Sequence, residues 1–202
     1  MREGYRPFLI VGAAVVVAAY IVFGSSAGQN ANHKETPEAL AARFERLSQS
    51  GNSTCSASFR QSVASGDAGE RLQGSCCSPM DLHRYTEQVE GLQQYASIPE
   101  IPPDPYDIDA ELAQQLTASY DAQLTPEQQL AYDYAMANSN EKGPCCCKCW
   151  RWYVYGGLGK LLIQKYGFTG EQVTEVWNLS DGCGGAGDHA GHEAPDAAKE
   201  TF

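Results

Sequence analysis

Cysteines are the residues of this chain whose type and spacing could do chemistry. Four of its eight cysteines fall within five residues, after Pro144 and before Trp150, and these are Cys145, Cys146, Cys147 and Cys149. An isolated cysteine in a protein core behaves as a small apolar side chain, but ordinary core packing does not place thiols on successive residues. Thiols this dense share a soft metal ion or pair into disulfides.

Two geometries of this segment would bring different thiols together. In an extended backbone, Cys145, Cys147 and Cys149 share one face, whereas a helical turn brings Cys146 close to Cys149. Crowded thiolates suit Cu(I), Zn, Hg(II) or an iron–sulfur cluster, and hard cations do not choose them. At the start of a helix, the helix dipole would also favour the ionised thiols.

Further candidate ligands precede and follow the predicted helices. Met80 and His83 come shortly after two adjacent thiols and share one helical face, so thiol, thioether and imidazole form a ligand set suited to copper. As ordinary residues, Met80 would lie in the core and His83 in solvent. One further thiol follows the last helix. The predicted metal ligands are Cys76, Cys77, Cys145, Cys146, Cys147, Cys149, Cys183, Met80 and His83.

Disulfides are the alternative use of the same thiols. The number of cysteines is even, and the four outside the dense segment, Cys55, Cys76, Cys77 and Cys183, balance the four within it. Thiol redox catalysis is a third use, but the Cys-x-x-Cys spacing here lacks a βαβ context. Paired carboxylates or a Ser–His arrangement for hydrolysis are also missing from the sequence. We therefore expect a binding protein and not an enzyme.

The N-terminal part of the sequence predicts where the thiols reside. Residues 8–24 (FLIVGAAVVVAAYIVFG) are apolar and follow Arg2 and Arg6, so the positive-inside rule places the rest of the chain outside the cytoplasm. The run of 17 residues is short for a membrane span and long for a signal-peptide core. Ser25-Ser26-Ala27 resembles a cleavage site. A single-pass anchor in the cell membrane and a cleaved signal on a secreted protein therefore both remain open.

The charge of the chain limits its partners. The formal net charge is −11 at pH 7. Such a surface repels nucleic acid and anionic lipid head groups. We expect no nucleic-acid partner.

The pattern of the remaining sequence predicts an all-α fold in four parts. Residues 1–24 are a signal anchor or signal peptide, 25–75 a flexible linker with one short helix, 76–183 a helical cysteine-rich domain, and 184–202 a disordered tail. Helices are expected to start at Thr36-Pro37, Ser78-Pro79 and Thr125-Pro126, because each pair places an N-cap before a first-turn proline.

A last pair of helices is expected after the cysteine-rich segment. The first spans 150–165 and contains Gly156, Gly157 and Gly159, each of which costs about 1 kcal/mol in a helix unless it lets another backbone approach closely. Gly167 should end it as a C-cap, and Thr169 with Gln172 should open the next helix. We expect the helix after Pro79 to bring Cys76 and Cys77 close to the 145–149 segment.

The frame Pro144-Cys145-x-Cys147-x-Cys149 resembles that of the PCYCGC-motif proteins, which are exported bacterial proteins of largely unassigned function. The chain differs at the intervening positions, Cys146 and Lys148, and downstream it offers Cys183 alone in place of a cysteine pair. The resemblance implies an envelope location and association with copper or heavy metals. It carries over Cys145, Cys147 and Cys149 and implies no catalytic residue.

These observations predict a membrane-anchored extracytoplasmic protein that binds a soft metal, of the copper or mercury class, as a chaperone, sink or sensor. Cu(I) is the first choice of ion, with Zn or Hg(II) as alternatives. The competing prediction is a disulfide-stapled helical module that acts as an accessory subunit of an envelope complex. Its partner would contact an aromatic patch of Trp150, Trp152 and Tyr153.

Overall fold

The computed structural model describes residues 35–67 and 69–185. The chain divides into two units, 1–36 and 37–202, and the second holds nearly all of the described residues. The predicted anchor or signal segment, 1–24, and the tail from 186 onward lie outside the described ranges. Within these ranges, no helix has both the length and the apolar character that crossing a bilayer requires.

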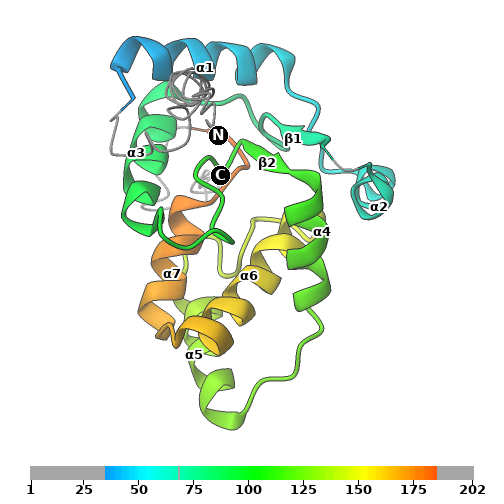
Figure 1. Ribbon diagram of the computed structural model, residues 1–202, viewed down its shortest axis with the longest axis vertical. Coiled ribbons are helices and arrows are strands. Elements are labelled where there is room, and N and C mark those ends of the chain that lie inside the picture. Colours follow the sequence, from blue (N-terminus) through cyan, green and yellow to red (C-terminus); the bar gives the residue numbers. More distant parts are fainter. Residues whose placement is uncertain (1–34, 68, 186–202) are drawn as a thin grey trace, which may run out of the picture. The chain divides into compact units, whose positions relative to one another are not determined.

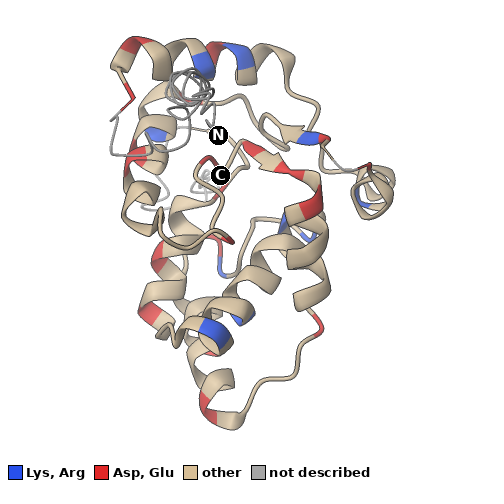
Figure 2. Cartoon of the chain, in the orientation of Figure 1, with Lys and Arg blue, Asp and Glu red and all other residues tan. Residues whose placement is uncertain are grey.

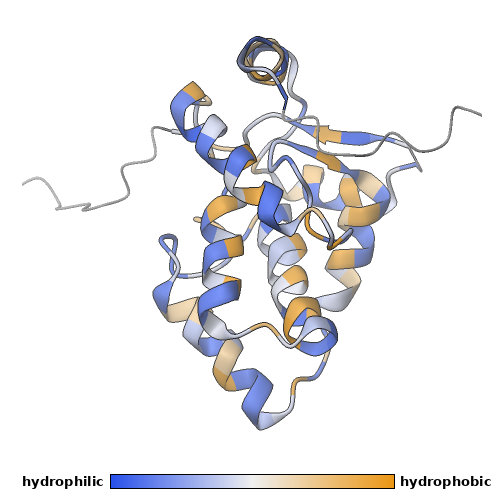
Figure 3. Cartoon of the chain, turned by 60° about the vertical axis from the view of Figure 1, so that its left-hand side comes forward, coloured by the Kyte–Doolittle hydropathy of each residue, from blue (hydrophilic) through white to orange (hydrophobic). Residues whose placement is uncertain are grey.

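Helices dominate the described part of the chain, as predicted. Two short strands form an antiparallel pair in which Leu72 lies opposite Ile108. In chain order the elements are α1 (Pro37–Ser50), α2 (Ala57–Ser65), β1 (Arg71–Gln73), α3 (Leu82–Leu92), the 3-10 turn η1 (Gln93–Tyr95), β2 (Asp107–Asp109), α4 (Ala110–Ser119), α5 (Pro126–Asn138), α6 (Trp150–Tyr166) and α7 (Gly170–Leu179). Hydrophobic and hydrophilic residues are both found along each helix (Figure 3), and an apolar residue every three or four positions gives a helix one face to bury.

Helix α6 lies at the centre of the main core, between α4 and α7 (Figure 1). A Cβ atom on Gly157 would overlap the carbonyl oxygen of Leu116, so α4 and α6 are in direct backbone contact there. Gly159 lies against the ring of Trp177, whose indole nitrogen donates a hydrogen bond to the Tyr155 carbonyl at 2.8 Å. The predicted close approach of another backbone is confirmed for Gly157, whereas Gly156 and Gly159 make room for the rings of Tyr120 and Trp177.

A second, smaller core joins α1 to α3. It consists of Leu40, Leu47, Tyr85, Val89 and Tyr106. The Tyr85 hydroxyl donates a hydrogen bond to the buried Asp104 carboxylate at 2.6 Å. Burial raises the pKa of Asp104, although the hydrogen bonds from Tyr85 and from the Tyr106 amide oppose that effect. The turn that leads into β2 is thus tied to α3.

Several predicted helix ends are confirmed. Thr125 and Thr169 each form a capping box at the start of α5 and α7, and Gly167 ends α6 with a left-handed φ of 69°. The predicted start at Ser78-Pro79 is wrong, because α3 begins at Leu82 and Asp81 is its N-cap.

The prediction that 25–75 is a linker with one short helix is also wrong. This range contains α1, α2 and β1. The few apolar residues of this range make core contacts: Val63 of α2 and Leu72 of β1 are both buried in the main core. Low average hydrophobicity therefore did not mean that the segment lacks a fixed structure.

Candidate metal centre

All eight cysteines converge on one network of contacting sulfurs, as free thiols. The closest Sγ pairs are Cys55 and Cys147 at 2.7 Å, Cys146 and Cys183 at 2.9 Å, Cys145 and Cys183 at 3.3 Å, and Cys55 and Cys77 at 3.3 Å. Three pairs lie farther apart: Cys76 and Cys77 at 3.6 Å, Cys145 and Cys149 at 3.7 Å, and Cys77 and Cys146 at 3.8 Å. The predicted proximity of Cys76 and Cys77 to the 145–149 segment is confirmed.

The 145–149 segment is held between a tight turn and the start of α6. The Ser139 hydroxyl donates to the Gly143 carbonyl at 3.0 Å and accepts from the Gly143 amide at 2.8 Å. Gly143 has a φ of 154°, and a Cβ atom there would meet the ring of Trp152. Cys149 is the N-cap of α6. The positive end of that helix therefore faces the sulfurs, as predicted, and favours their ionised form.

Backbone hydrogen bonds hold the segment with Cys76 and Cys77 against the segment with Cys183. The Ser78 amide donates to the Cys183 carbonyl at 2.8 Å, and the Cys76 amide donates to the Gly182 carbonyl at 3.3 Å. Gly184 has a φ of 85°, and a Cβ atom there would overlap the Ser78 carbonyl oxygen. Position 184 therefore requires glycine for this close pairing.

Cys55 is the ligand candidate that the sequence-based metal set missed. It lies just before α2, whose N-cap is Ser56, and the Phe59 ring packs edge-on to Trp150 at 6.1 Å between centroids. This contact brings the start of α2 to the start of α6. The even number of cysteines could have pointed to Cys55. The predicted metal set held seven of the eight cysteines, and Cys55 was the one left out.

Burial divides the network into two halves. The inner cysteines are Cys145, Cys149 and Cys183, which are only 2%, 6% and 6% exposed, together with the half-buried Cys76, whose Sγ lies with those of Cys145 and Cys183. The outer cysteines are Cys55, Cys77, Cys146 and Cys147, of which the first three are exposed and the last is half-buried. Contacts such as the one between Cys146 and Cys183 join the two halves.

One thiol in each half is set to ionise more easily than its neighbours. Hydrogen bonds from Cys145, Cys149 and Cys183 lower the pKa of Cys76 below that of an ordinary thiol. Burial would raise the pKa of Cys147, but hydrogen bonds led by the one from Cys55 lower it. Burial and the surrounding sulfurs instead raise the pKa of Cys55, and hydrogen bonds to Cys149 and Cys183 raise that of Cys145.

A buried arginine lies against the inner cysteines. Arg151 is 0% exposed, and its guanidinium donates to the carbonyl oxygens of Pro105 and Gly74, the latter at 2.9 Å. A Cβ atom on Gly182 would overlap this guanidinium, so the loop that carries Cys183 lies directly on it. Burial alone would lower the pKa of Arg151, but the ionisable groups around it, Tyr155 first and then three inner cysteines, raise it. Within the described ranges, Arg151 has no carboxylate in salt-bridge contact.

The other two predicted ligands, Met80 and His83, have ordinary surroundings. The His83 side chain is 85% exposed and contacts Glu87 at 3.1 Å from Nε2, and none of the cysteine groups found among the described residues includes it. Met80 is partly buried and packs against the second core. Because α3 begins only at Leu82, Met80 does not share its helical face with His83. The structure therefore gives each residue its ordinary role: Met80 packs against apolar side chains and His83 is exposed to solvent.

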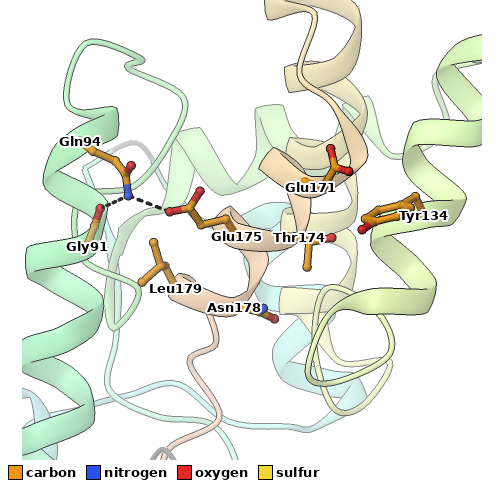
Figure 4. Close-up of a pocket in the computed structure, with 8 residues that line it drawn as sticks. All are labelled: Gly91, Gln94, Tyr134, Glu171, Thr174, Glu175, Asn178 and Leu179. Carbon is orange, nitrogen blue, oxygen red and sulfur yellow. Dashed lines mark hydrogen bonds between the residues drawn. The ribbon is translucent and has the colours of Figure 1, made fainter.

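A separate hollow of about 380 Å³ lies among α3, α5 and α7, and Figure 4 shows its lining. Gln94 donates to Glu175 at 3.1 Å and to the Gly91 carbonyl at 2.9 Å. Tyr95 donates to the other oxygen of Glu175 at 2.9 Å. The polar groups on this side of the hollow are thus bonded to one another, and the cysteine network remains the candidate site.

Comparison with known proteins adds no relative to this description: no family model, no curated protein and no solved structure matches the chain. The resemblance to the PCYCGC-motif proteins therefore rests on the motif itself.

Proposed function

We propose that this protein binds soft metal ions outside the cytoplasm, and that all eight cysteines hold the ions in a metal–thiolate cluster. Cu(I) is the expected ion, with Zn or Hg(II) as alternatives, and the role is that of a chaperone, sink or sensor at the cell membrane. The proposal includes anchoring or export through 8–24, which the apolar run and its arginines support.

The observation that carries the proposal is the convergence of every thiol in the chain. Cysteines before α2, after β1, before α6 and after α7 meet in one network, although up to 92 residues separate the members of a contacting pair. Two thiolates on one tetrahedral ion lie about 3.8 Å apart when each bond is about 2.3 Å long. The Sγ pairs at 3.6, 3.7 and 3.8 Å have that spacing.

The number of sulfurs favours more than one ion. A tetrahedral ion takes four ligands, and Cu(I) takes no more than that. Eight connected sulfurs, shared between the inner and outer halves, can therefore serve two or more ions bridged by common thiolates.

Arg151 favours thiolates over disulfides in the inner half. A buried cation is costly unless an anion compensates it. Disulfides are neutral, whereas several thiolates on one metal ion keep a net negative charge. The guanidinium lies against the Cys183 loop and has no carboxylate in salt-bridge contact in the described part of the chain. A metal–thiolate cluster would supply the missing anion.

The test is Cu(I) titration of the full chain against a competing chelator, after anaerobic purification. We expect at least one Cu(I) per chain, and loss of binding when Cys145, Cys147 and Cys149 are all changed to Ser. Arg151→Lys keeps the buried charge and should retain more affinity than Arg151→Gln. Binding that survives the triple change would contradict the proposal, as would equal affinities in two folded Arg151 variants.

Disulfides remain the second candidate, because two Sγ pairs lie at only 2.7 and 2.9 Å. The protein would then be a stapled interaction module. Trp150 is 1% exposed and packs in the core, so the aromatic patch proposed for a partner is reduced to the partly buried Trp152 and Tyr153. A count of free thiols on the anaerobic protein distinguishes the candidates, since the metal-binding form requires reduced cysteines.

A further inference from the structure

The division of the network into two halves fixes the route by which an ion can enter, if the proposed function holds. Cys145 and Cys183 are almost fully buried, so an ion cannot reach them first. Cys55 is exposed and its Sγ lies 2.7 Å from that of the half-buried Cys147. The outer cysteines are therefore the point of entry.

A small pocket opens at this point. It has a volume of about 240 Å³ and brings sulfur ligands and cationic side chains to one place. Its lining consists of Cys55, Ser56, Ala57, Arg60, Cys147, Lys148 and Cys149. The start of α2 forms one wall, and the 147–149 segment before α6 forms the other.

The two cations of this pocket are held over aromatic rings. The Arg60 guanidinium lies 4.5 Å from the centre of the Tyr153 ring, and the Lys148 ammonium lies 5.6 Å from that of Trp152. Neither is ion-paired with a carboxylate in the part of the chain that the structure describes. Acidic residues are spread over the helices (Figure 2), and the net charge of the chain is −11. The two cations beside the entry thiols therefore make this pocket locally positive on a protein that is negative overall.

We propose that this pocket binds the donor of the metal, and that the donor is an anionic complex of a soft ion with small thiols that carry carboxylates. Arg60 and Lys148 would attract the carboxylates of the complex, while the metal faces Cys55 and Cys147. The pocket is smaller than a typical drug-sized site of about 300–1,000 Å³. It therefore fits a compact ligand of one or two amino-acid units better than a protein surface.

Transfer in this pocket is an exchange of ligands without a change in oxidation state. The bond between the metal and a donor sulfur breaks, and a bond between the metal and the Sγ of Cys55 or Cys147 forms. The proton of the entering thiol passes to the departing donor thiolate, directly or through water, and the donor leaves as a free thiol. No oxidant or reductant is consumed.

The experiment compares two Cu(I) donors of opposite charge by stopped-flow on the reduced full chain. One is the Cu(I)–cysteine complex, which is anionic, and the other is the Cu(I)–acetonitrile cation. The variants are Arg60→Glu and Lys148→Glu. Arg46→Glu is the matched control, because Arg46 is exposed on α1 and undergoes the same change of charge.

We expect each pocket variant to accept Cu(I) from the anionic donor about tenfold more slowly at low salt, with the difference shrinking as salt screens the charges. The acetonitrile donor should not be slowed, the final stoichiometry should be unchanged, and the control should match the wild type. Arg60→Ala and Lys148→Ala should accept Cu(I) from the anionic donor at rates between those of the wild type and of the corresponding Glu variants.

Other results overturn the inference in distinguishable ways. If both donors are slowed equally, or neither is, or if the control is slowed as much as the pocket variants, the docking site is refuted while Cu(I) binding stands. If the wild type takes up Cu(I) from neither donor, the proposed function fails and the docking site fails with it.

Discussion

Reduction of the protein should leave its stability intact if the cluster binds metal, and should remove most of it if the cluster consists of disulfides. The two closest sulfur pairs are separated by 92 residues, for Cys55 and Cys147, and by 37 residues, for Cys146 and Cys183. Closing loops of these lengths by disulfides would stabilise the fold by about 4.6 and about 3.8 kcal/mol. Together that is about 8 kcal/mol, against a total of about 5–15 kcal/mol for a typical domain.

The assay is urea denaturation of the full chain, followed by far-ultraviolet circular dichroism. Four samples are compared under anaerobic conditions, with and without a non-thiol phosphine reductant, and each with and without Cu(I). Since the metal-binding form already has reduced cysteines, we expect the reductant to leave the midpoint unchanged. Cu(I) at 100 times its Kd should then add about 2.7 kcal/mol to the free energy of unfolding.

One outcome refutes this reasoning. If reduction lowers the free energy of unfolding by several kcal/mol and Cu(I) does not restore it, the cysteines are structural cross-links and the proposed function is wrong. The full chain is required for this measurement, because a fragment of 76–183 would lack Cys55 together with the core residues Val63 and Leu72.

Two further predictions concern the fold. Gly157→Ala should destabilise the protein by about 3 kcal/mol, because the added Cβ meets the backbone of α4, which cannot rotate away; exposed Leu130→Ala, the control, should cost no more than about 0.5 kcal/mol in the same urea titration. Burial would raise the pKa of Glu100, but hydrogen bonds from Lys165 and Tyr166 lower it. Its stabilising effect is therefore present above its unfolded pKa of about 4.3 and is lost as the pH falls through the lower, folded value. Glu100→Gln should cost about 1 kcal/mol at pH 7 and show a weaker loss of stability towards pH 3, and a parallel pH dependence in variant and wild type would contradict this assignment.

Local signals in the sequence predicted the helix ends correctly where short-range bonds determine them. Thr169 with Gln172, and Gly167 with its left-handed φ, act within one helical turn and need no tertiary contact. Ser78-Pro79 offered the same kind of signal, but there the Pro79 carbonyl accepts from the Gly185 amide at 2.8 Å and Met80 pairs with Gly185 in an isolated β-bridge. A contact from a distant segment therefore delays the start of α3 to Leu82.

The cysteine network was predicted only in part for the same reason. The density of thiols at 145–149 located the network, and Cys76 and Cys77 lie in it as predicted. Cys55 was missed because its neighbours are polar and read as a linker, whereas β1 places this segment by pairing with β2, more than 30 residues later. His83 was assigned from helical spacing alone, which says nothing about the side of α3 that faces the sulfurs.

The separation of the cysteines along the chain also determines when the site can form during synthesis. Cys55, Cys76 and Cys77 emerge from the ribosome well before the 145–149 segment, and Cys183 emerges after α7. A network built from such distant segments has a high contact order and closes late in folding. A nascent chain therefore presents three thiols without their partners, and contact with an oxidant at that stage would trap wrong pairs. Correct assembly thus requires that these early thiols stay reduced until the last of the four segments has arrived.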